Sequence, residues 1–313
     1  MGRVDEAMRR AAERAAGGAA GAAAEAIRSE IPRSTAAVAA ADAAVDVRLR
    51  EVYRGPGRSA RDAAPAPSPM FGAVRDGLCA RLTGKVVVDP HMLPQSREQY
   101  RRLAATLHQG QTEHGLKVIM LTSALPGEGK TLTASNLALT FSESYHRRVL
   151  LIDADLRRPS LHEIFDVDGS IGLGEGLTAD EDQPLALRHV SAHLTVLPAG
   201  RPTASPMNAL TSDRMRRLIA EARDVFDWVI IDTPPVGLIA DANLLAGMSD
   251  GALLVIKAED TPYPLVRRAV DALGRDRVLG VVLNRTLADV SASKYDYSGY
   301  YSAAASPARE TVD

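Results

Sequence analysis

Cysteine is almost absent from this chain of 313 residues, which contains only Cys79. A single cysteine excludes a disulfide framework and any metal or iron–sulfur site that is built from paired cysteines. The seven histidines show no spacing that is typical of metal ligands. We therefore expect no metal centre of the cysteine or histidine type.

Long apolar runs are absent as well. No stretch of 18 or more apolar residues occurs, so the sequence predicts no transmembrane helix. Residues 1–16, "MGRVDEAMRRAAERAA", are charged where a secretory signal would be apolar. The net charge is only −2, which gives no sign of a general nucleic-acid binder. We expect a cytoplasmic protein without a nucleic-acid partner.

Composition divides the chain into three parts. Residues 1–93 are rich in alanine, arginine and glycine and include "APAPSP" at 64–69, which predicts a linker-like or disordered extension. Val4–Ala16 could form a short helix there, either as part of the linker or as a docking helix for a partner. Residues 94–287 predict one folded domain, and residues 288–313 predict a flexible tail.

The folded part alternates between helix and strand patterns. Ser96 and Gln99 match a capping box, and apolar residues at helical spacing follow them. Continuous apolar runs come next, as in parallel strands that are buried on both faces. The pattern predicts an α/β fold with a doubly wound, mostly parallel sheet. The predicted strands are "KVIML" (117–121), "VLLID" (149–153), "LTVLP" (194–198), "WVIID" (228–232), "LLVIK" (253–257) and "VLGVVL" (278–283).

A phosphate-binding loop follows the first of these strands. The segment "ALPGEGKT" matches the P-loop pattern G-x-x-x-x-G-K-[ST], with alanine at its first position. Its backbone N–H groups and the start of the next helix favour phosphate oxygens. We expect Lys130 to reach the β- and γ-phosphates of ATP and Thr131 to ligate Mg²⁺. The predicted nucleotide contacts are Ala124, Leu125, Pro126, Gly127, Glu128, Gly129, Lys130, Thr131 and Leu132.

Three aspartates lie at the ends of predicted strands. Asp153 and Asp155 end "VLLIDAD", and Asp232 ends "WVIID". A carboxylate buried behind such runs is costly unless a cation or hydrogen bonds offset it. Any one of them could cap a helix, but together beside a P-loop they predict a Mg²⁺-nucleotide site for phosphoryl transfer. We assign Asp155 and Asp232 to Mg²⁺, and Asp153 to accepting or orienting the proton of the attacking hydroxyl. With Lys130 they form the predicted catalytic set.

Two features follow the last predicted strand. Asn284 could contact the nucleotide base or simply end the strand. The tail then carries "KYDYSGYY", residues 294–301, in a small, polar segment that cannot bury aromatic rings. Alone, this segment is typical of a mobile tail or an added edge strand. Beside a phosphoryl-transfer site its tyrosines become candidate phosphate acceptors, namely Tyr295, Tyr297, Tyr300 and Tyr301.

Together these segments resemble the bacterial protein-tyrosine kinases of capsule and exopolysaccharide systems. The resemblance covers about residues 96–301 and rests on "TSALPGEGKT", "VLLIDADLRRPSLHEIF", "LTVLPAGRPTASPMNAL", "FDWVIIDTPPVGLIADA", "VLGVVLNR" and the tyrosine-rich tail. It implies ATP-dependent autophosphorylation of the tail between neighbours in a ring-shaped homo-oligomer. It also implies a separate membrane-spanning activator, which would bring the kinase to the inner membrane, and a tyrosine phosphatase as a further partner.

One segment departs from the family pattern. The helix before the P-loop often carries E-x-x-R-x-x-R, which is used in subunit contact. Glu98 and Arg101 fit this motif, but its last position is Ala104, with Arg102 nearby. The departure bears on the ring contact and not on the nucleotide site.

Two other functions are compatible with the same motifs. Positioning ATPases share the fold, but they usually carry a lysine where this chain has Leu125, and they often end in an amphipathic membrane helix. Here the tail is polar and rich in tyrosine. A scaffold of the export machinery that binds ATP without turnover is the third alternative, because intact motifs do not prove catalysis.

Overall fold

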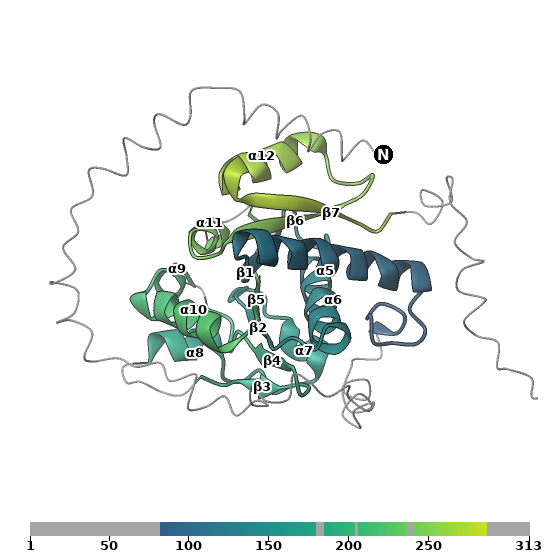
Figure 1. Cartoon of the computed structure of the whole chain (residues 1–313). Helices are drawn as coiled ribbons and strands as arrows, with labels where there is room; N and C mark the ends of the chain where they lie inside the picture. Colours follow the sequence, from purple (N-terminus) through teal and green to yellow (C-terminus); the bar gives the residue numbers. More distant parts are fainter. Residues whose placement is uncertain (1–81, 180–184, 204–205, 237–240, 287–313) are drawn as a thin grey trace, which may run out of the picture. The chain divides into compact units, whose positions relative to one another are not determined.

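The structure is a computed structural model that describes residues 82–179, 185–203, 206–236 and 241–286. Most of the predicted extension and the whole tail lie outside these residues. The described strands form one sheet in the order β3-β4-β2-β5-β1-β6-β7 (Figure 1). The strands are β1 Val118–Ser123, β2 Val149–Asp153, β3 Arg188–His189, β4 Leu194–Leu197, β5 Trp228–Asp232, β6 Gly251–Lys257 and β7 Val278–Asn284.

Helices separate most of these strands along the chain. Thr140–Ser144 is a π-helical turn, η3, which continues α6, and Arg275–Arg277 is a 3-10 turn, η4. The α-helices are α5 Pro94–His114, α6 Lys130–Leu139, α7 Leu161–Phe165, α8 Leu173–Thr178, α9 Pro206–Leu210, α10 Asp213–Val225, α11 Asp241–Ala246 and α12 Tyr263–Leu273.

The sheet is parallel except at one edge. β1 pairs with β5 and β6, β2 with β4 and β5, and β6 with β7, all in parallel. Only the two-residue strand β3 runs antiparallel to its neighbour β4 among the described strands. The predicted mostly parallel, doubly wound sheet is therefore confirmed, whereas β3 was not predicted because two residues carry no periodic pattern.

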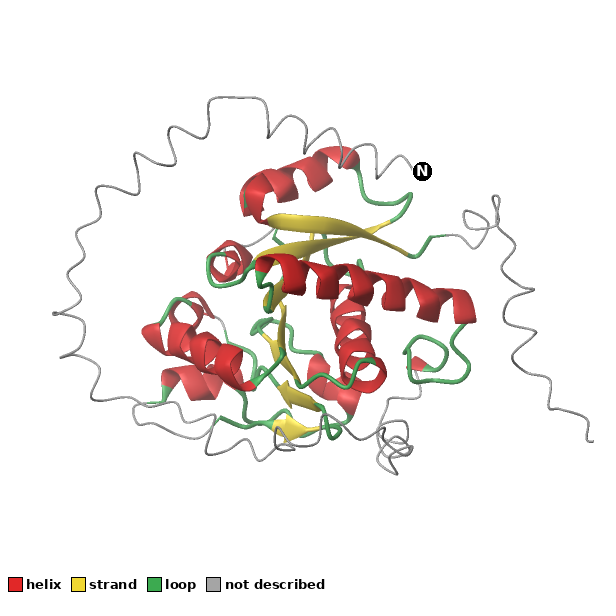
Figure 2. Ribbon diagram, viewed as in Figure 1, coloured by secondary structure: helices red, strands yellow, loops and turns green. Residues whose placement is uncertain are grey.

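The central strands carry apolar residues on both faces because helices cover both faces of the sheet (Figure 2). In β1, Ile119 and Leu121 belong to the apolar cluster that includes α5, α6 and α7, whereas Val118 and Met120 belong to the cluster that includes α8 to α12. Alternate residues of one strand thus enter two different cores. This arrangement explains why the strand runs are continuous rather than alternating.

The start of α5 corrects one prediction. The predicted capping box at Ser96 and Gln99 is wrong, because the helix begins at Pro94 with Leu93 as its N-cap and no capping side chain. Proline favours the first helical position, since its fixed φ suits a helix and its missing N–H would be unpaired there anyway.

No helix in the described part of the chain is both long and apolar enough to cross a bilayer.

The polar ends of the parallel strands collect at one edge of the sheet. The P-loop follows β1, Asp153 ends β2, Asp232 ends β5 and Asn284 ends β7. In the strand register Asp153 lies opposite Asp232, which in turn lies opposite Leu121 of β1. In open α/β sheets this edge is where ligands bind.

Candidate nucleotide site

The P-loop, residues 124–131, connects β1 to α6. Gly127 and Gly129 have φ values of 80° and 92°, which lie in the left-handed region that strains other residues. Gly129 is also the N-cap of α6, and no side chain caps the helix there. The first N–H groups of α6, together with the helix dipole, therefore suit a phosphate group.

Lys130 is the first residue of α6, and its ammonium group lies among acidic oxygens. Its Nζ is 3.2 Å from Oδ2 of Asp155 and 3.5 Å from Oδ1 of Asp232. It also donates a hydrogen bond of 3.2 Å to Oγ1 of Thr131. Burial by itself would lower the pKa of Lys130, but the two aspartates outweigh burial and raise this pKa. The P-loop thus carries a fixed positive charge.

Asp232 is fully buried at the end of β5. Within the described chain, neither of its carboxylate oxygens accepts a hydrogen bond of normal geometry. Burial raises the pKa of Asp232 above its usual range, although Lys130 acts in the opposite direction. A buried carboxylate of this kind is costly in isolation, and a bound cation would offset that cost.

The oxygen atoms around Lys130 fit Mg²⁺ that is bound together with a nucleotide. Thr131, Asp155 and Asp232 offer the hard oxygen ligands that Mg²⁺ prefers. Among the described residues, no group of three or more His, Cys, Asp and Glu side chains could hold a metal by itself. Mg²⁺ at nucleotide sites usually takes one or two carboxylates and completes its coordination with phosphates and water.

Asp153 faces backbone N–H groups rather than the ammonium of Lys130. Its Oδ1 accepts a hydrogen bond of 3.2 Å from the N–H of Asp155, and its Oδ2 accepts bonds of 3.0 Å from Ser160 and Leu161. Burial raises the pKa of Asp153, and these hydrogen bonds oppose the rise. The carboxylate therefore orients the start of α7, and its part in proton transfer stays a prediction.

Asn284, the last residue of β7, supports the P-loop directly. Its Nδ2 donates a hydrogen bond of 2.8 Å to the carbonyl oxygen of Glu128. A Cβ atom on residue 129 would lie 2.1 Å from the same Nδ2, so this position of Asn284 requires Gly129. Asn284 does end its strand, and contact with a nucleotide base stays a prediction.

The other predicted nucleotide contacts lie in different environments. Ala124 is buried in the apolar cluster that includes α8 to α12, and Leu132 packs, partly buried, against the cluster that includes α5, α6 and α7. Pro126 is exposed, whereas the N–H of Leu125 already donates a hydrogen bond of 2.7 Å to the Glu128 carboxylate. The four predicted acceptor tyrosines of the tail lie outside the described residues.

Two polar residues beside the site were not predicted. The hydroxyl of Thr261 donates a hydrogen bond to the Glu128 carboxylate, and Oγ of Ser160 lies 3.5 Å from Oγ1 of Thr131. Thr261 lies outside the segments that carry the resemblance, and Ser160 lies within "VLLIDADLRRPSLHEIF" but had no predicted role. The only signal in the sequence was their position shortly after a predicted strand, at the edge where ligands bind.

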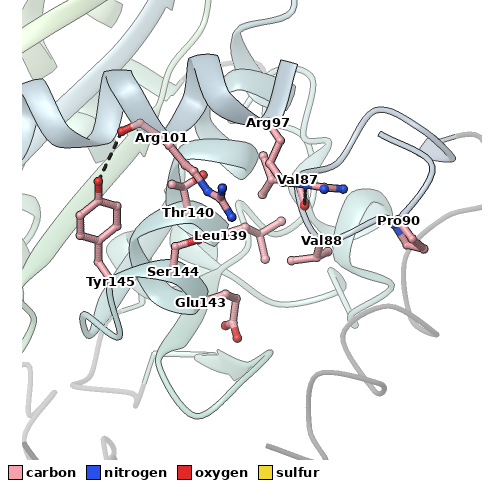
Figure 3. Close-up of a pocket in the computed structure, with 10 residues that line it drawn as sticks. All are labelled: Val87, Val88, Pro90, Arg97, Arg101, Leu139, Thr140, Glu143, Ser144 and Tyr145. Carbon is pink, nitrogen blue, oxygen red and sulfur yellow. Dashed lines mark hydrogen bonds between the residues drawn. The ribbon is translucent and has the colours of Figure 1, made fainter. Parts of the chain in front are cut away.

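A cavity of about 880 Å³ lies at the end of α6 that is opposite to the P-loop (Figure 3). Arg97 and Arg101 of α5 and Glu143 of η3 contribute to its lining. Arg97 donates hydrogen bonds of 2.9 Å and 2.7 Å to the carbonyl oxygens of Val87 and Asp89, so it fixes the loop that precedes α5. Because the cavity lies at the Leu139 end of α6 and the P-loop lies at the Lys130 end, the cavity is separate from the nucleotide site.

The packing of α5 explains why the E-x-x-R-x-x-R motif lacks its last arginine. Glu98 lies 3.9 Å from Arg101 and 3.6 Å from Arg102, and both arginine side chains are more than half exposed. Ala104, at the position where the family pattern has arginine, is fully buried against the core. A charged side chain would not fit there in this packing.

Fold and site together define a P-loop NTPase of the α/β class. The family model described as "AAA domain" matches residues 116–265. This range includes the P-loop and all three aspartates.

Comparison with individual proteins narrows the class. The chain is 34% identical to tyrosine-protein kinase YwqD of Bacillus subtilis over 232 residues, which are 73% of this chain and 96% of that protein. It is 33% identical to the succinoglycan biosynthesis transport protein ExoP of Rhizobium meliloti over 72% of this chain and 29% of that protein. The kinase domain of the Escherichia coli tyrosine kinase ETK superposes with a TM-score of 0.55 at 31% identity, covering 64% of this chain and 79% of that one. The chain therefore belongs to the bacterial tyrosine-protein kinases, as its sequence motifs indicated.

Proposed function

We propose that the chain is an ATP-dependent protein-tyrosine kinase that phosphorylates the tyrosines of its own C-terminal tail. The observation that carries this proposal is the ammonium of Lys130, held between Asp155 and Asp232 at the start of α6 in a member of this family. In the reaction, a tyrosine oxygen attacks the γ-phosphorus of ATP and the bond to the bridging oxygen breaks. ADP then leaves, and the tyrosine proton passes to a base.

The residues of the site have different roles in phosphoryl transfer. The P-loop amides and Lys130 hold the phosphates and stabilise the charge that develops on them. Thr131, Asp155 and Asp232 would hold Mg²⁺, which when bound neutralises phosphate charge. A tyrosine hydroxyl, with a pKa of about 10, arrives protonated. Asp153 is the proposed proton acceptor, since a carboxylate whose pKa is raised by burial is a stronger base than an ordinary aspartate.

The wider role that we propose is control of exopolysaccharide or capsule production. Its support is the similarity to ExoP, whose name assigns that protein to succinoglycan biosynthesis and transport. The proposal includes a homo-oligomer in which neighbours phosphorylate each other. It also includes a membrane-spanning activator that brings the cytoplasmic kinase to the membrane, and a tyrosine phosphatase that reverses the modification.

One labelling experiment separates the kinase from its two alternatives. The protein is incubated with Mg²⁺ and ATP labelled at the γ-phosphate, and phosphotyrosine is mapped by mass spectrometry. We expect label on the tail tyrosines. Free phosphate without labelled protein would indicate a positioning ATPase, and nucleotide binding with neither product would indicate a scaffold.

Two lysine variants make the assay specific. Lys130→Ala should lower labelling by about 100-fold or more, because it removes a charge that stabilises the transition state. Lys117→Ala is the matched control, since Lys117 precedes β1 at the opposite end of that strand from the P-loop. Equal labelling by the two variants would contradict the proposed role of Lys130.

A further inference from the structure

Glu128 is a buried carboxylate inside the P-loop that the proposed chemistry does not use. The residue is only 3% exposed. Its Oε2 accepts a hydrogen bond of 2.7 Å from the N–H of Leu125, within the same loop. Its Oε1 accepts a hydrogen bond from the hydroxyl of Thr261 and a longer one, 3.4 Å, from the N–H of Lys257. The side chain thus joins the P-loop to the segment between β6 and α12.

The donors around this carboxylate are neutral. The ammonium of Lys257 lies 3.0 Å from Oδ2 of Asp260 instead, so the donor that Lys257 gives to Glu128 is its backbone N–H. Hydrogen bonds to an ionised acceptor are shorter and stronger than those between neutral groups. The hydroxyl of Thr261 is therefore a substantial part of what holds Glu128 in place.

The segment that carries Thr261 is itself fixed to the sheet. The N–H of Lys257 donates 3.1 Å to Oγ1 of Thr261, and the N–H of Thr261 donates 3.1 Å to the carbonyl oxygen of Lys257. The N–H of Ala258 donates 2.9 Å to the carbonyl oxygen of Asn284. Because β6 and β7 are paired neighbours in the sheet (Figure 1), Thr261 and Asn284 are anchored to one rigid unit.

Residue 128 is consequently attached to this unit twice. Its carboxylate contacts Thr261, and its carbonyl oxygen accepts the hydrogen bond of 2.8 Å from Asn284. The two neighbours of Glu128 are the glycines with φ values of 80° and 92°. Glycine is the most conformationally permissive residue, so the phosphate-binding part of the loop is flexible unless something outside it fixes its shape.

We infer that Glu128, Thr261 and Asn284 form a brace that sets the shape of the P-loop before nucleotide binds. The inference rests on the proposed nucleotide-dependent function and adds positioning residues to it. A loop that is ordered in advance loses less conformational entropy on binding, so the brace raises nucleotide affinity. The contact is made equally in the ground state and in the transition state, and its loss should therefore raise KM without lowering kcat.

The test compares two substitutions at one position. Thr261→Val keeps the shape of the side chain and removes the hydroxyl, whereas Thr261→Ser keeps the hydroxyl. Titration calorimetry with Mg²⁺-ADP should give a Kd that is about tenfold higher for the valine variant, because one charge-assisted hydrogen bond is lost. The serine variant should bind within about twofold of the wild-type chain. In the labelling assay, Thr261→Val should raise KM for ATP about tenfold with kcat within about twofold.

Further variants separate the brace from a purely structural contact. Thr211→Val is the matched control, because Oγ1 of Thr211 donates 2.8 Å to the carbonyl oxygen of Met207, within α9 and its end. It should leave Kd and KM unchanged. If the valine variant at 261 does not fold, Asn284→Asp serves instead, since its oxygen would face the carbonyl oxygen of Glu128 and should also weaken binding.

The outcomes distinguish this inference from the function on which it rests. Wild-type affinity in Thr261→Val, or equal losses in Thr261→Val and Thr261→Ser, would overturn the brace. A wild-type chain that binds Mg²⁺-ADP but labels no tyrosine would overturn the kinase proposal, and the ratio of ADP affinities would still decide the brace. A wild-type chain that binds no nucleotide would overturn both.

Discussion

Gly129 carries a constraint that its neighbour Gly127 does not. Both have positive φ, but a Cβ atom at Gly127 would meet nothing within 4 Å, whereas one at Gly129 would meet Nδ2 of Asn284 at 2.1 Å. Gly127→Ala should therefore cost about 1–2 kcal/mol of unfolding free energy, which is the backbone term alone. Gly129→Ala should cost more, because it also displaces the amide of Asn284.

Urea unfolding of the nucleotide-free protein measures this difference. Adding Asn284→Gly to Gly129→Ala removes the clash, so the double variant should lose less than the sum of the two single losses. Equal unfolding free energies for the two alanine variants would show that Asn284 moves aside at no cost.

The buried aspartates predict how stability depends on pH. Burial raises the pKa of both Asp153 and Asp232, so the folded protein retains protons that the unfolded chain has already released. Their stabilising contribution is complete below the ordinary aspartate pKa of about 3.9 and falls as pH rises through the raised values. Without nucleotide and Mg²⁺, the free energy of unfolding should decrease between about pH 4 and pH 7.

The variant Asp232→Asn tests this dependence. Asparagine does not titrate, so the slope of unfolding free energy against pH should become shallower over the same interval. Saturating Mg²⁺-nucleotide should flatten the wild-type slope as well, because a bound cation stabilises the ionised carboxylate. A stability that rises with pH in the nucleotide-free wild type would contradict the assignment.

At the scale of single elements, α10 offers a clean test of helix capping. Oγ of Ser212 accepts a hydrogen bond of 3.2 Å from the N–H of Met215, and the helix behind it buries an apolar face. Ser212→Ala should lower the free energy of unfolding by about 1 kcal/mol. Ser212→Asp keeps an acceptor at the positive end of the helix dipole but loses the hydrogen bond of 2.7 Å that Oγ donates to the carbonyl oxygen of Ala209, so it should lose less stability than Ser212→Ala. Equal losses in both variants would contradict the capping role of Ser212.

Elements were predictable where their signal is local and repeated. The runs at 149–153 and 228–232 coincide with β2 and β5, because four consecutive apolar residues before the terminal aspartate fit a strand that is buried on both faces. The start of α5 was mistaken, because the preference of Pro94 for the first helical position outweighed the side-chain pattern of Ser96 and Gln99. The strand β3 depends on its pairing with β4, which two residues cannot reveal.

The residues of the candidate site were likewise predictable only where they lie in a local sequence motif. Lys130 and Asp232 could be found because the P-loop motif and the strand ends are continuous stretches of sequence. Thr261 could not, since it meets Glu128 only after β6 has been placed beside β1. The hydrogen bonds that Asp153 accepts from the N–H groups of Ser160 and Leu161 likewise follow from where the chain turns after β2.

At the scale of the whole molecule, the proposed transfer between neighbours predicts complementation. One variant, Lys130→Ala, keeps its tail but should be inactive. The other replaces Tyr295, Tyr297, Tyr300 and Tyr301 with phenylalanine and keeps its site. Mixed with labelled ATP, the two should place label on the tail of the first variant, and the tails can be told apart by mass.

The kinetics of the wild-type chain provide the control for this mixture. Transfer between chains makes the initial rate rise faster than linearly with protein concentration, at least until the oligomer is complete. Two results together would place the reaction within one chain. The first is a mixture in which the tail of the Lys130→Ala variant gains no label, and the second is a wild-type initial rate that is strictly proportional to protein concentration.

The order of the strands also has a consequence for the synthesis of the protein. Val118 of β1 pairs with Val229 of β5, and Ile119 pairs with Gly251 of β6. The strand β1 therefore cannot complete its pairing until β5 and β6 have left the ribosome. The P-loop gains its last support only when Asn284 has emerged. The nucleotide site is therefore incomplete until β7 has emerged, and the nascent chain has no fully supported P-loop before that point.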